Sequence, residues 1–148
     1  MLRCVIIEDE FPAREELKYF LSKHKGITLE KEFENPVDSL KYLQEHEVDV
    51  VFLDINMPEL DGMSLGKILI KLNPNLKIIF ITAYRDYAAE AFEIKAFDYL
   101  LKPYSEKRIM EVLNNLSSSK ETLQVKEVEK INKVTVFSSE KMLVISLD

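Results

Sequence analysis

Three acidic residues directly follow two apolar runs of the chain. Asp54 follows the run at 50–53, and Glu8 and Asp9 follow the run at 4–7. Apolar runs without polar alternation are typical of strands buried on both faces of a parallel sheet, and ligands bind at the carboxyl ends of such strands. We therefore expect the three carboxylates to meet at one edge of a sheet. Clustered carboxylate oxygens favour a hard divalent cation such as Mg²⁺.

Two further polar residues end the next strands along the chain. Thr82 follows the apolar run at 78–81, and Lys102 follows the run at 98–101. Carboxylates alone repel a phosphoryl group, so a cation and Lys102 are needed to neutralise its oxygens, with Thr82 as a neutral hydrogen-bond donor. Asp54 lies between Glu8 and Asp9, the acids expected to hold the metal (the metal acids), and the pair Thr82 and Lys102. This central position makes Asp54 the expected nucleophile. The expected product is an acyl phosphate.

The remaining sequence alternates between strand and helix patterns. Helix-start signals occur at Pro12, at Asn35-Pro36 and at Asp61-Gly62, where Asp61 is interpreted as a turn and cap residue. Apolar residues at helical spacing are expected to face the core. They include Val37, Ile68 and Leu72. Strands are expected over 2–7, 27–33, 50–53, 78–81 and 98–101, and the last two helices over 87–94 and 105–116.

This alternation predicts a doubly wound α/β fold. With right-handed crossovers, the five strands form a parallel sheet, and their burial patterns fit the order 2-1-3-4-5. The strand at 27–33 alternates apolar and polar residues, which is typical of a less buried edge strand. In this order the switch point lies between the first and third strands, beside Glu8, Asp9 and Asp54.

Composition restricts the classes of function. The 148 residues are 47% hydrophobic and 31% charged, which is ordinary for a globular domain with an appendage. A net charge of −6 gives no basic footprint for nucleic acid, so DNA binding must come from sequence that is not present. No apolar stretch approaches the roughly 18 residues of a membrane span. The start of the chain leaves no room for a signal peptide, and the single Cys4 fits a reducing compartment, so we expect a cytoplasmic protein without a membrane partner.

The site motifs together resemble the receiver domain of bacterial two-component response regulators, which has a flavodoxin-like fold. The resemblance covers about residues 1–118. It rests on motifs in order at strand ends, namely Glu8-Asp9, Asp54 with Met57-Pro58 and Asp61-Gly62, Thr82-Ala83, and Tyr99 with Lys102-Pro103. The resemblance implies phosphotransfer from a sensor histidine kinase to Asp54, and a cis Lys102-Pro103 bond. It implies Mg²⁺ held by Glu8, Asp9, Asp54 and the backbone carbonyl of Asn56.

The resemblance also implies a switch made by Thr82 and Tyr99. The threonine hydroxyl moves toward the phosphate as the tyrosine ring turns inward. The helix at 87–94 is short and buries little, so moving it should cost few contacts. We therefore expect phosphorylation to change the face formed by 87–94, 98–101 and 105–116, and two such faces to pair as a homodimer.

A narrower resemblance concerns the output of the signal. Residues 91–103 are similar to receivers of the LytTR class, whose output is a β-rich DNA-binding domain. We interpret 119–132 as a linker or helix extension, and 133–148 as the opening strands of such an output domain, truncated here. DNA would then be contacted only through the part of that domain that this chain lacks.

Three alternative functions are weaker. A phosphatase of the haloacid dehalogenase type needs a second Asp two residues after the nucleophile, where this chain has Asn56. A flavin-phosphate binding module needs a Ser, Thr or Gly-rich loop after the first strand, where this chain has residues 8–11 with two Glu and one Asp. A degenerate receiver that acts only as an interaction domain is disfavoured because no site residue is missing. A Mg²⁺ titration would distinguish such a domain from a receiver that accepts a phosphoryl group. We expect a signalling domain that assists its own phosphotransfer and dephosphorylation, not an enzyme.

Overall fold

Five strands form one parallel sheet in the order β2-β1-β3-β4-β5, as the sequence predicts. The strands are β1 (Leu2–Ile7), β2 (Ile27–Phe33), β3 (Val50–Leu53), β4 (Lys77–Thr82) and β5 (Asp98–Leu101). The helices are α1 (Phe11–Ser22), α2 (Pro36–Glu45), α3 (Gly62–Leu72), α4 (Ala88–Glu93) and α5 (Glu106–Ser117). This computed structural model describes residues 1–118, so the interpretations of 119–132 and 133–148 fall outside the described residues.

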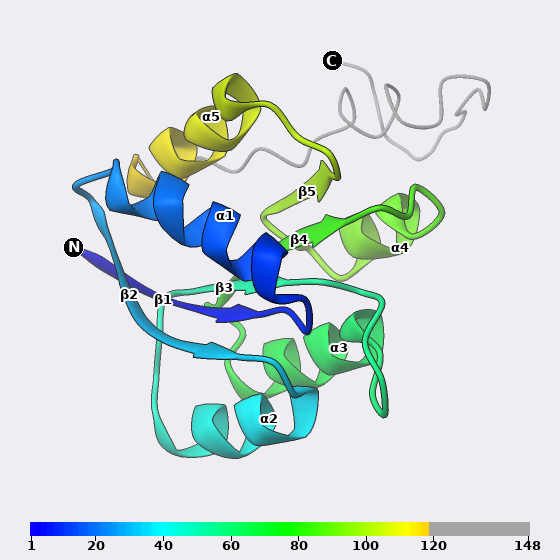
Figure 1. The fold of residues 1–148 in the computed structure, drawn as a ribbon. Coiled ribbons are helices and arrows are strands. Elements are labelled where there is room, and N and C mark those ends of the chain that lie inside the picture. The colour runs from blue at the N-terminus through cyan, green and yellow to red at the C-terminus, as the bar shows by residue number, and fades with distance from the viewer. Residues whose placement is uncertain (119–148) are drawn as a thin grey trace.

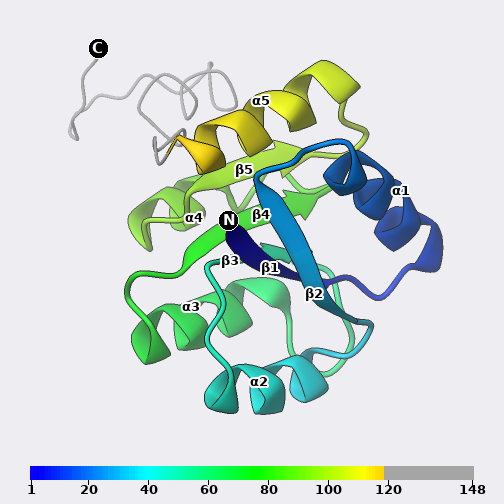
Figure 2. The same ribbon diagram turned by 90° about the vertical axis from the view of Figure 1, so that its left-hand side faces the viewer.

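Helices cover both faces of the sheet. Helices α1 and α5 lie on one face, and α2, α3 and α4 lie on the other (Figure 1, Figure 2). The residues of β3 alternate between the two cores: Val51 and Leu53 pack on the α3 side, whereas Val50 and Phe52 pack on the α1 and α5 side. All four are essentially inaccessible to solvent, which explains the unbroken apolar run of this strand. The alternating strand β2 is partly exposed at the sheet edge, as expected.

Polar caps set the helix starts. The Asn35 side chain accepts hydrogen bonds from the N–H groups of Val37 and Asp38, at 2.7 and 3.2 Å, and Pro36 occupies the first turn. Asp61 accepts from the N–H of Ser64 at 2.9 Å, which confirms its interpretation as a cap. Because these side chains satisfy N–H groups that a helix leaves unpaired, they fix where α2 and α3 begin.

Three residues predicted to face the core are instead exposed. Val37, Ile68 and Leu72 have between 37% and 51% of their surface accessible to solvent. In α3 the buried stripe runs through Gly62, Leu65, Gly66 and Leu69, so two glycines occupy positions where periodicity favours large apolar residues. For Ile68 and Leu72 the prediction was wrong because α3 is apolar on most of its circumference, and glycine allows close packing that a hydrophobicity pattern does not register.

Because the strands are parallel, the sheet has a carboxyl edge, where the strands end, and an opposite edge, where they begin. The two edges carry different residues. The carboxyl ends of β1, β3, β4 and β5 carry the candidate site, and α5 runs back to the opposite edge (Figure 1). There Ser117 lies against the turn before β2, because a Cβ added to Gly26 would be 2.6 Å from the Ser117 hydroxyl oxygen. His24 Nε2 lies 3.0 Å from Asn114 Oδ1 at the same end. Among residues 1–118, no helix has the length and apolar character that crossing a membrane requires.

Candidate functional site

The three predicted acids meet at the carboxyl edge of the sheet. Glu8 and Asp9 follow β1, Asp54 follows the neighbouring β3, and each offers a carboxylate oxygen within 4.8 Å of the others. Glu8 and Asp54 are 5% and 7% exposed, whereas Asp9 is more open to solvent. A donor set made only of carboxylate oxygens suits a hard cation such as Mg²⁺, so these residues fit the metal that the sequence predicts.

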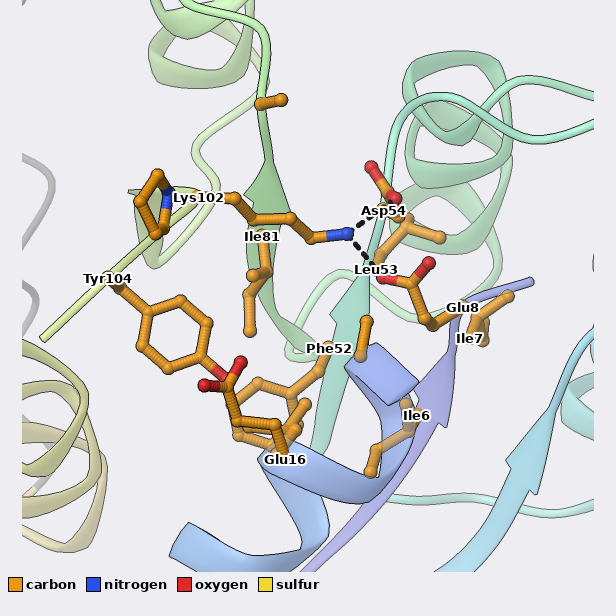
Figure 3. A pocket seen from close by; sticks show the side chains of 14 residues that line it. Ile6, Ile7, Glu8, Glu16, Phe52, Leu53, Asp54, Ile81, Lys102 and Tyr104 are labelled. Atoms are coloured by element: carbon orange, nitrogen blue, oxygen red, sulfur yellow. Dashed lines mark hydrogen bonds and ion pairs between the residues drawn. The ribbon is translucent and has the colours of Figure 1, made fainter. Parts of the chain in front are cut away.

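Lys102 joins two of these acids. Its Nζ atom lies 2.8 Å from Glu8 Oε1 and 3.0 Å from Asp54 Oδ2 (Figure 3). The side chain comes from the loop that follows β5, and the Lys102-Pro103 bond is cis, as the resemblance implies. Sequence reasoning therefore located this cation correctly beside the expected nucleophile.

Burial changes the acid–base properties of the site. Burial raises the pKa of Glu8 to about 7, and the nearby Asp54 charge adds to this effect against the opposing hydrogen bond from Lys102. Burial alone would lower the pKa of Lys102, but the hydrogen bond to Glu8 and the charge of Asp54 raise it overall. Lys102 therefore remains a cation at neutral pH, while Glu8 is poised between its two protonation states.

Thr82 and Tyr99 converge on the backbone of Tyr84. Thr82, at the end of β4, is fully buried, and its hydroxyl oxygen accepts the Tyr84 N–H at 3.3 Å. The Tyr99 ring is 1% exposed, and its hydroxyl donates a hydrogen bond to the Tyr84 carbonyl. Burial raises the pKa of Tyr99, so this hydroxyl keeps its proton. The ring therefore lies inward, packed in the core.

The loop after Asp54 is held by short backbone contacts. The Asn56 N–H donates to Asp54 Oδ1 at 3.3 Å, and the Gly62 N–H donates to the Ile55 carbonyl at 2.8 Å. A Cβ on Gly62 would lie 1.9 Å from the backbone oxygen of Asp54, so no larger residue fits there. Glu59 adopts a φ of 73° in the same loop. Asp54, the expected nucleophile, is therefore followed by a turn between β3 and α3 that backbone hydrogen bonds and close packing hold in place.

A pocket of about 380 Å³ gives access to the site. It lies beside Lys102 between α1 and the segment after β5, and its walls are mostly apolar (Figure 3). Glu8 and Asp54 line one part of it, and Glu16 faces the hydroxyl of Tyr104 at another. Because Asp54 is almost fully buried, this pocket provides an opening toward its carboxylate.

Sequence reasoning missed two features of this site. The main chain of Tyr84 is bonded to both predicted switch residues, since its N–H donates to Thr82 and its carbonyl accepts from Tyr99. Backbone contacts of this kind leave no trace in residue type. Arg14 donates from Nη1 to the backbone carbonyl of Glu8 at 2.8 Å, although its helix position looks like that of any exposed basic residue. The one feature of the sequence that involves Arg14 is its spacing of four residues from Lys18. That spacing indicates a shared helix face and does not predict a contact with Glu8.

Comparison with known proteins identifies the family. A family model for the response regulator receiver domain matches residues 4–114, and the chain belongs to this family. The crystal structure of the response regulatory domain of protein MrkE from Klebsiella pneumoniae is 42% identical, with a TM-score of 0.77. That alignment covers 80% of this chain and 97% of the MrkE domain chain. The predicted family and the receiver fold are therefore confirmed.

Two curated relatives extend beyond the matched region. Transcriptional regulatory protein YpdB from Escherichia coli is 42% identical over 118 residues, which are 80% of this chain and 48% of YpdB. Sensory transduction protein LytT from Bacillus cereus is 38% identical over 137 residues, which are 92% of this chain and 56% of LytT. The chain thus spans about half the length of these relatives.

Proposed function

We propose that this receiver accepts a phosphoryl group on Asp54 from a sensor histidine kinase, and that the modification changes the face around α4 to control a DNA-binding output domain. The observation that carries the proposal is the position of Asp54. Its carboxylate lies with those of Glu8 and Asp9 and 3.0 Å from Lys102 Nζ, at the edge of a parallel sheet. Family membership supports the same role.

The metal would be held by Glu8, Asp9, Asp54 and the backbone carbonyl of Asn56. When bound, Mg²⁺ neutralises phosphoryl oxygens and orients them for in-line displacement. The residues themselves prepare the site for this exchange: the three carboxylates repel one another, and Lys102 offsets only part of that repulsion. We therefore expect cation binding to stabilise the fold by linkage.

The transfer itself is a displacement at phosphorus. A carboxylate oxygen of Asp54 forms the new P–O bond, the P–N bond of the donor phosphohistidine breaks, and the imidazole leaves with the electron pair. Lys102 Nζ pairs with a phosphoryl oxygen in place of one of its two present carboxylate partners. The Thr82 hydroxyl accepts one hydrogen bond now and still carries a proton that it can donate to a second phosphoryl oxygen. The same groups assist the later hydrolysis by water.

The proposed output is dimerisation through the α4 face. Helix α4 has six residues and exposes Phe92, and the ring of Tyr87 lies edge-on to that of Tyr84 before it. Only Ala88 and Ala91 of this helix are buried, so its displacement sacrifices little packing. We propose that two phosphorylated chains pair through α4, β5 and α5, and present two LytTR-type domains to paired DNA half-sites. The similarity to LytT supports this class of output domain.

We also propose a cytoplasmic location, because Cys4, a free and buried thiol, fits the reducing conditions there.

The phosphatase alternative remains disfavoured, because the position two residues after the proposed nucleophile is Asn56, which cannot serve as a general acid. The interaction-domain alternative predicts no response to Mg²⁺.

Phosphotransfer can be tested directly. The full chain is incubated with Mg²⁺ and acetyl phosphate, and the modified residue is located by mass spectrometry. We expect a label on Asp54 in the wild type and none in Asp54→Asn. Asp61→Asn is the matched control, since Asp61 is an acid of the same loop that only caps α3. Undiminished labelling of Asp54→Asn would refute the assignment.

Dimerisation needs a separate measurement. Sedimentation velocity with and without beryllofluoride, a phosphoryl mimic, should show a dimer only with the mimic, together with altered amide exchange over 82–104. A chain that stays monomeric with unchanged exchange there would contradict the α4 mechanism, and would favour release of an intramolecular output domain.

A further inference from the structure

Arg14 is a largely buried cation beside the metal acids that the proposed reaction does not use. Only 11% of its side chain is exposed. Its Nη1 atom donates to the Glu8 carbonyl at 2.8 Å, its Nε donates to Glu32 Oε1 at 3.1 Å, and its Nη2 lies 4.0 Å from Glu34 Oε1. The guanidinium therefore connects α1 to the ends of β1 and β2.

The bond from Arg14 completes the fixation of Glu8. The Glu8 N–H donates to the carbonyl of Phe33 at 2.9 Å, and Arg14 holds the Glu8 carbonyl. Both peptide planes flanking Glu8 are thus fixed by groups outside the loop. The second plane joins Glu8 to Asp9, so its orientation sets the direction in which Asp9 projects its side chain.

The charge of Arg14 is offset locally. An uncompensated guanidinium next to a divalent cation would repel that cation. Here Glu32 and Glu34 face the guanidinium from β2 and the residue after it, and the Phe11 ring lies 5.6 Å from its Cζ atom. The arrangement keeps the directional donors of Arg14 while reducing the field that its charge exerts at the acids.

We propose that Arg14 is a positioning residue for the divalent-cation site, which it orders through the Glu8 carbonyl. The inference rests on the proposed function, because the site it orders is the proposed metal site. A geometric role and a purely electrostatic role of Arg14 predict opposite changes in Mg²⁺ affinity when Arg14 is replaced. Removing a positive charge should tighten Mg²⁺ binding if only electrostatics matters, whereas removing the donor should weaken it if the peptide orientation matters.

Three variants of the full chain separate these effects. Arg14→Gln removes the charge and the fork of donors, and Arg14→Lys keeps the charge but loses the fork. Lys18→Gln is the matched control. Lys18 lies one turn further along α1 and pairs with Glu32 at 2.7 Å, the same carboxylate that Arg14 contacts. This variant therefore loses the same charge as Arg14→Gln without losing a contact to Glu8. Mg²⁺ binding is measured by isothermal titration calorimetry, and the stability of each variant without metal by thermal melting.

We expect both Arg14 variants to bind Mg²⁺ about tenfold more weakly, the usual cost of losing a residue that orients a metal ligand, with Lys18→Gln unchanged or slightly tighter. The rate of Asp54 labelling by acetyl phosphate should return to the wild-type value at saturating Mg²⁺, because Arg14 orders the metal acids and does not contact the reacting atoms. Thermal melting without metal reports any general loss of stability separately from the change in Mg²⁺ affinity.

Wild-type or tighter Mg²⁺ affinity in Arg14→Gln would overturn the inference. If that variant does not fold, wild-type affinity in Arg14→Lys would overturn it equally. The proposed function fails in a different way: a wild-type chain that binds no Mg²⁺ and carries no label would overturn the proposed function together with this inference. A wild-type chain that binds Mg²⁺ and is labelled, beside Arg14 variants that bind it equally well, would overturn the inference alone.

Discussion

The hydroxyl of Tyr99 donates to the backbone carbonyl of Tyr84, and the hydroxyl oxygen of Thr82 accepts from the N–H of the same residue. The two residues of the proposed switch therefore hold one residue from two sides. If the Thr82 hydroxyl turns toward a phosphoryl group, the Tyr84 N–H loses its acceptor while Tyr99 retains the carbonyl. Of the two switch residues, Tyr99 alone would then hold the main chain of Tyr84.

Replacing Tyr99 with Phe should isolate this contact. The ring still packs against Phe80, whose centroid lies 6.1 Å away, but the Tyr84 carbonyl loses its donor. We expect the free energy of unfolding to fall by about 1 kcal/mol, the usual contribution of such a hydrogen bond. Urea denaturation measures the loss, and amide exchange should show faster exchange over 82–90. Tyr104→Phe is the control, because its hydroxyl faces Glu16 and should leave that exchange unchanged.

The raised pKa of Glu8 predicts an unusual dependence of stability on pH. Folding raises this pKa from 4.5 to about 7, so the folded state binds the proton more tightly than the unfolded state. The corresponding stabilisation is complete below pH 4.5 and is lost as pH rises through about 7. Without Mg²⁺, the contribution of Glu8 to the free energy of unfolding should therefore decrease across this window.

Glu8→Gln measures that contribution. Urea denaturation in EDTA, repeated at several pH values, should give a difference between wild type and variant that shifts against the wild type as pH rises. The same comparison with saturating Mg²⁺ should show a weaker shift, because a bound cation favours the carboxylate. A difference that stays constant from pH 4.5 to about 7 would contradict the raised pKa.

Two glycines of α3 should respond differently to alanine. At Gly62 the new Cβ would lie 1.9 Å from the backbone oxygen of Asp54, which cannot move without displacing the main chain of Asp54. We expect Gly62→Ala to lose about 3 kcal/mol of unfolding free energy, and to slow labelling of Asp54. At Gly66 the nearest atom is Cζ of Phe80 at 2.9 Å, and alanine favours the helix by about 1 kcal/mol, so Gly66→Ala should be nearly neutral. Equal losses in urea denaturation would contradict this account.

The sequence predicted the fold well because the signals for it are local. The apolar runs ending at Asp54 and Thr82 are buried strands, and capping residues such as Asn35 start helices where expected. Predicted burial failed where apolar residues cover most of a helix, as at Ile68. The acids and Lys102 were identifiable because strand ends in a parallel sheet converge, whatever the details of packing.

Contacts made by buried charges were not predictable from the sequence. Asp98 begins β5 and is fully buried, and Arg108 Nη1 and Nη2 donate to it at 3.2 and 2.9 Å. A spacing of ten residues carries no helical or strand periodicity that would indicate this pair. Arg14 and its contact with Glu8 were missed for the same reason, because burial of a charge depends on the three-dimensional neighbours that satisfy it.

The Asp98 pair provides a further prediction. Arg108→Leu leaves the buried Asp98 carboxylate without these two donors, so the free energy of unfolding should fall by about 3 kcal/mol. In the double variant Asp98→Asn/Arg108→Leu the buried group is neutral, and the loss should be smaller than in Arg108→Leu alone. Urea denaturation of the single and double variants tests this, and a double variant at least as unstable as the single one would refute the electrostatic explanation.

The course of α5 determines which partners can be present together. Asp54 lies at the carboxyl edge of the sheet, whereas Ser117 lies at the opposite edge against Gly26, and the 12 residues of α5 span roughly 18 Å between them. A donor group that approaches Asp54 therefore meets the receiver at the end opposite to the one where α5 finishes. A group held at Asp54 and a contact made at the end of α5 therefore do not compete for the same surface.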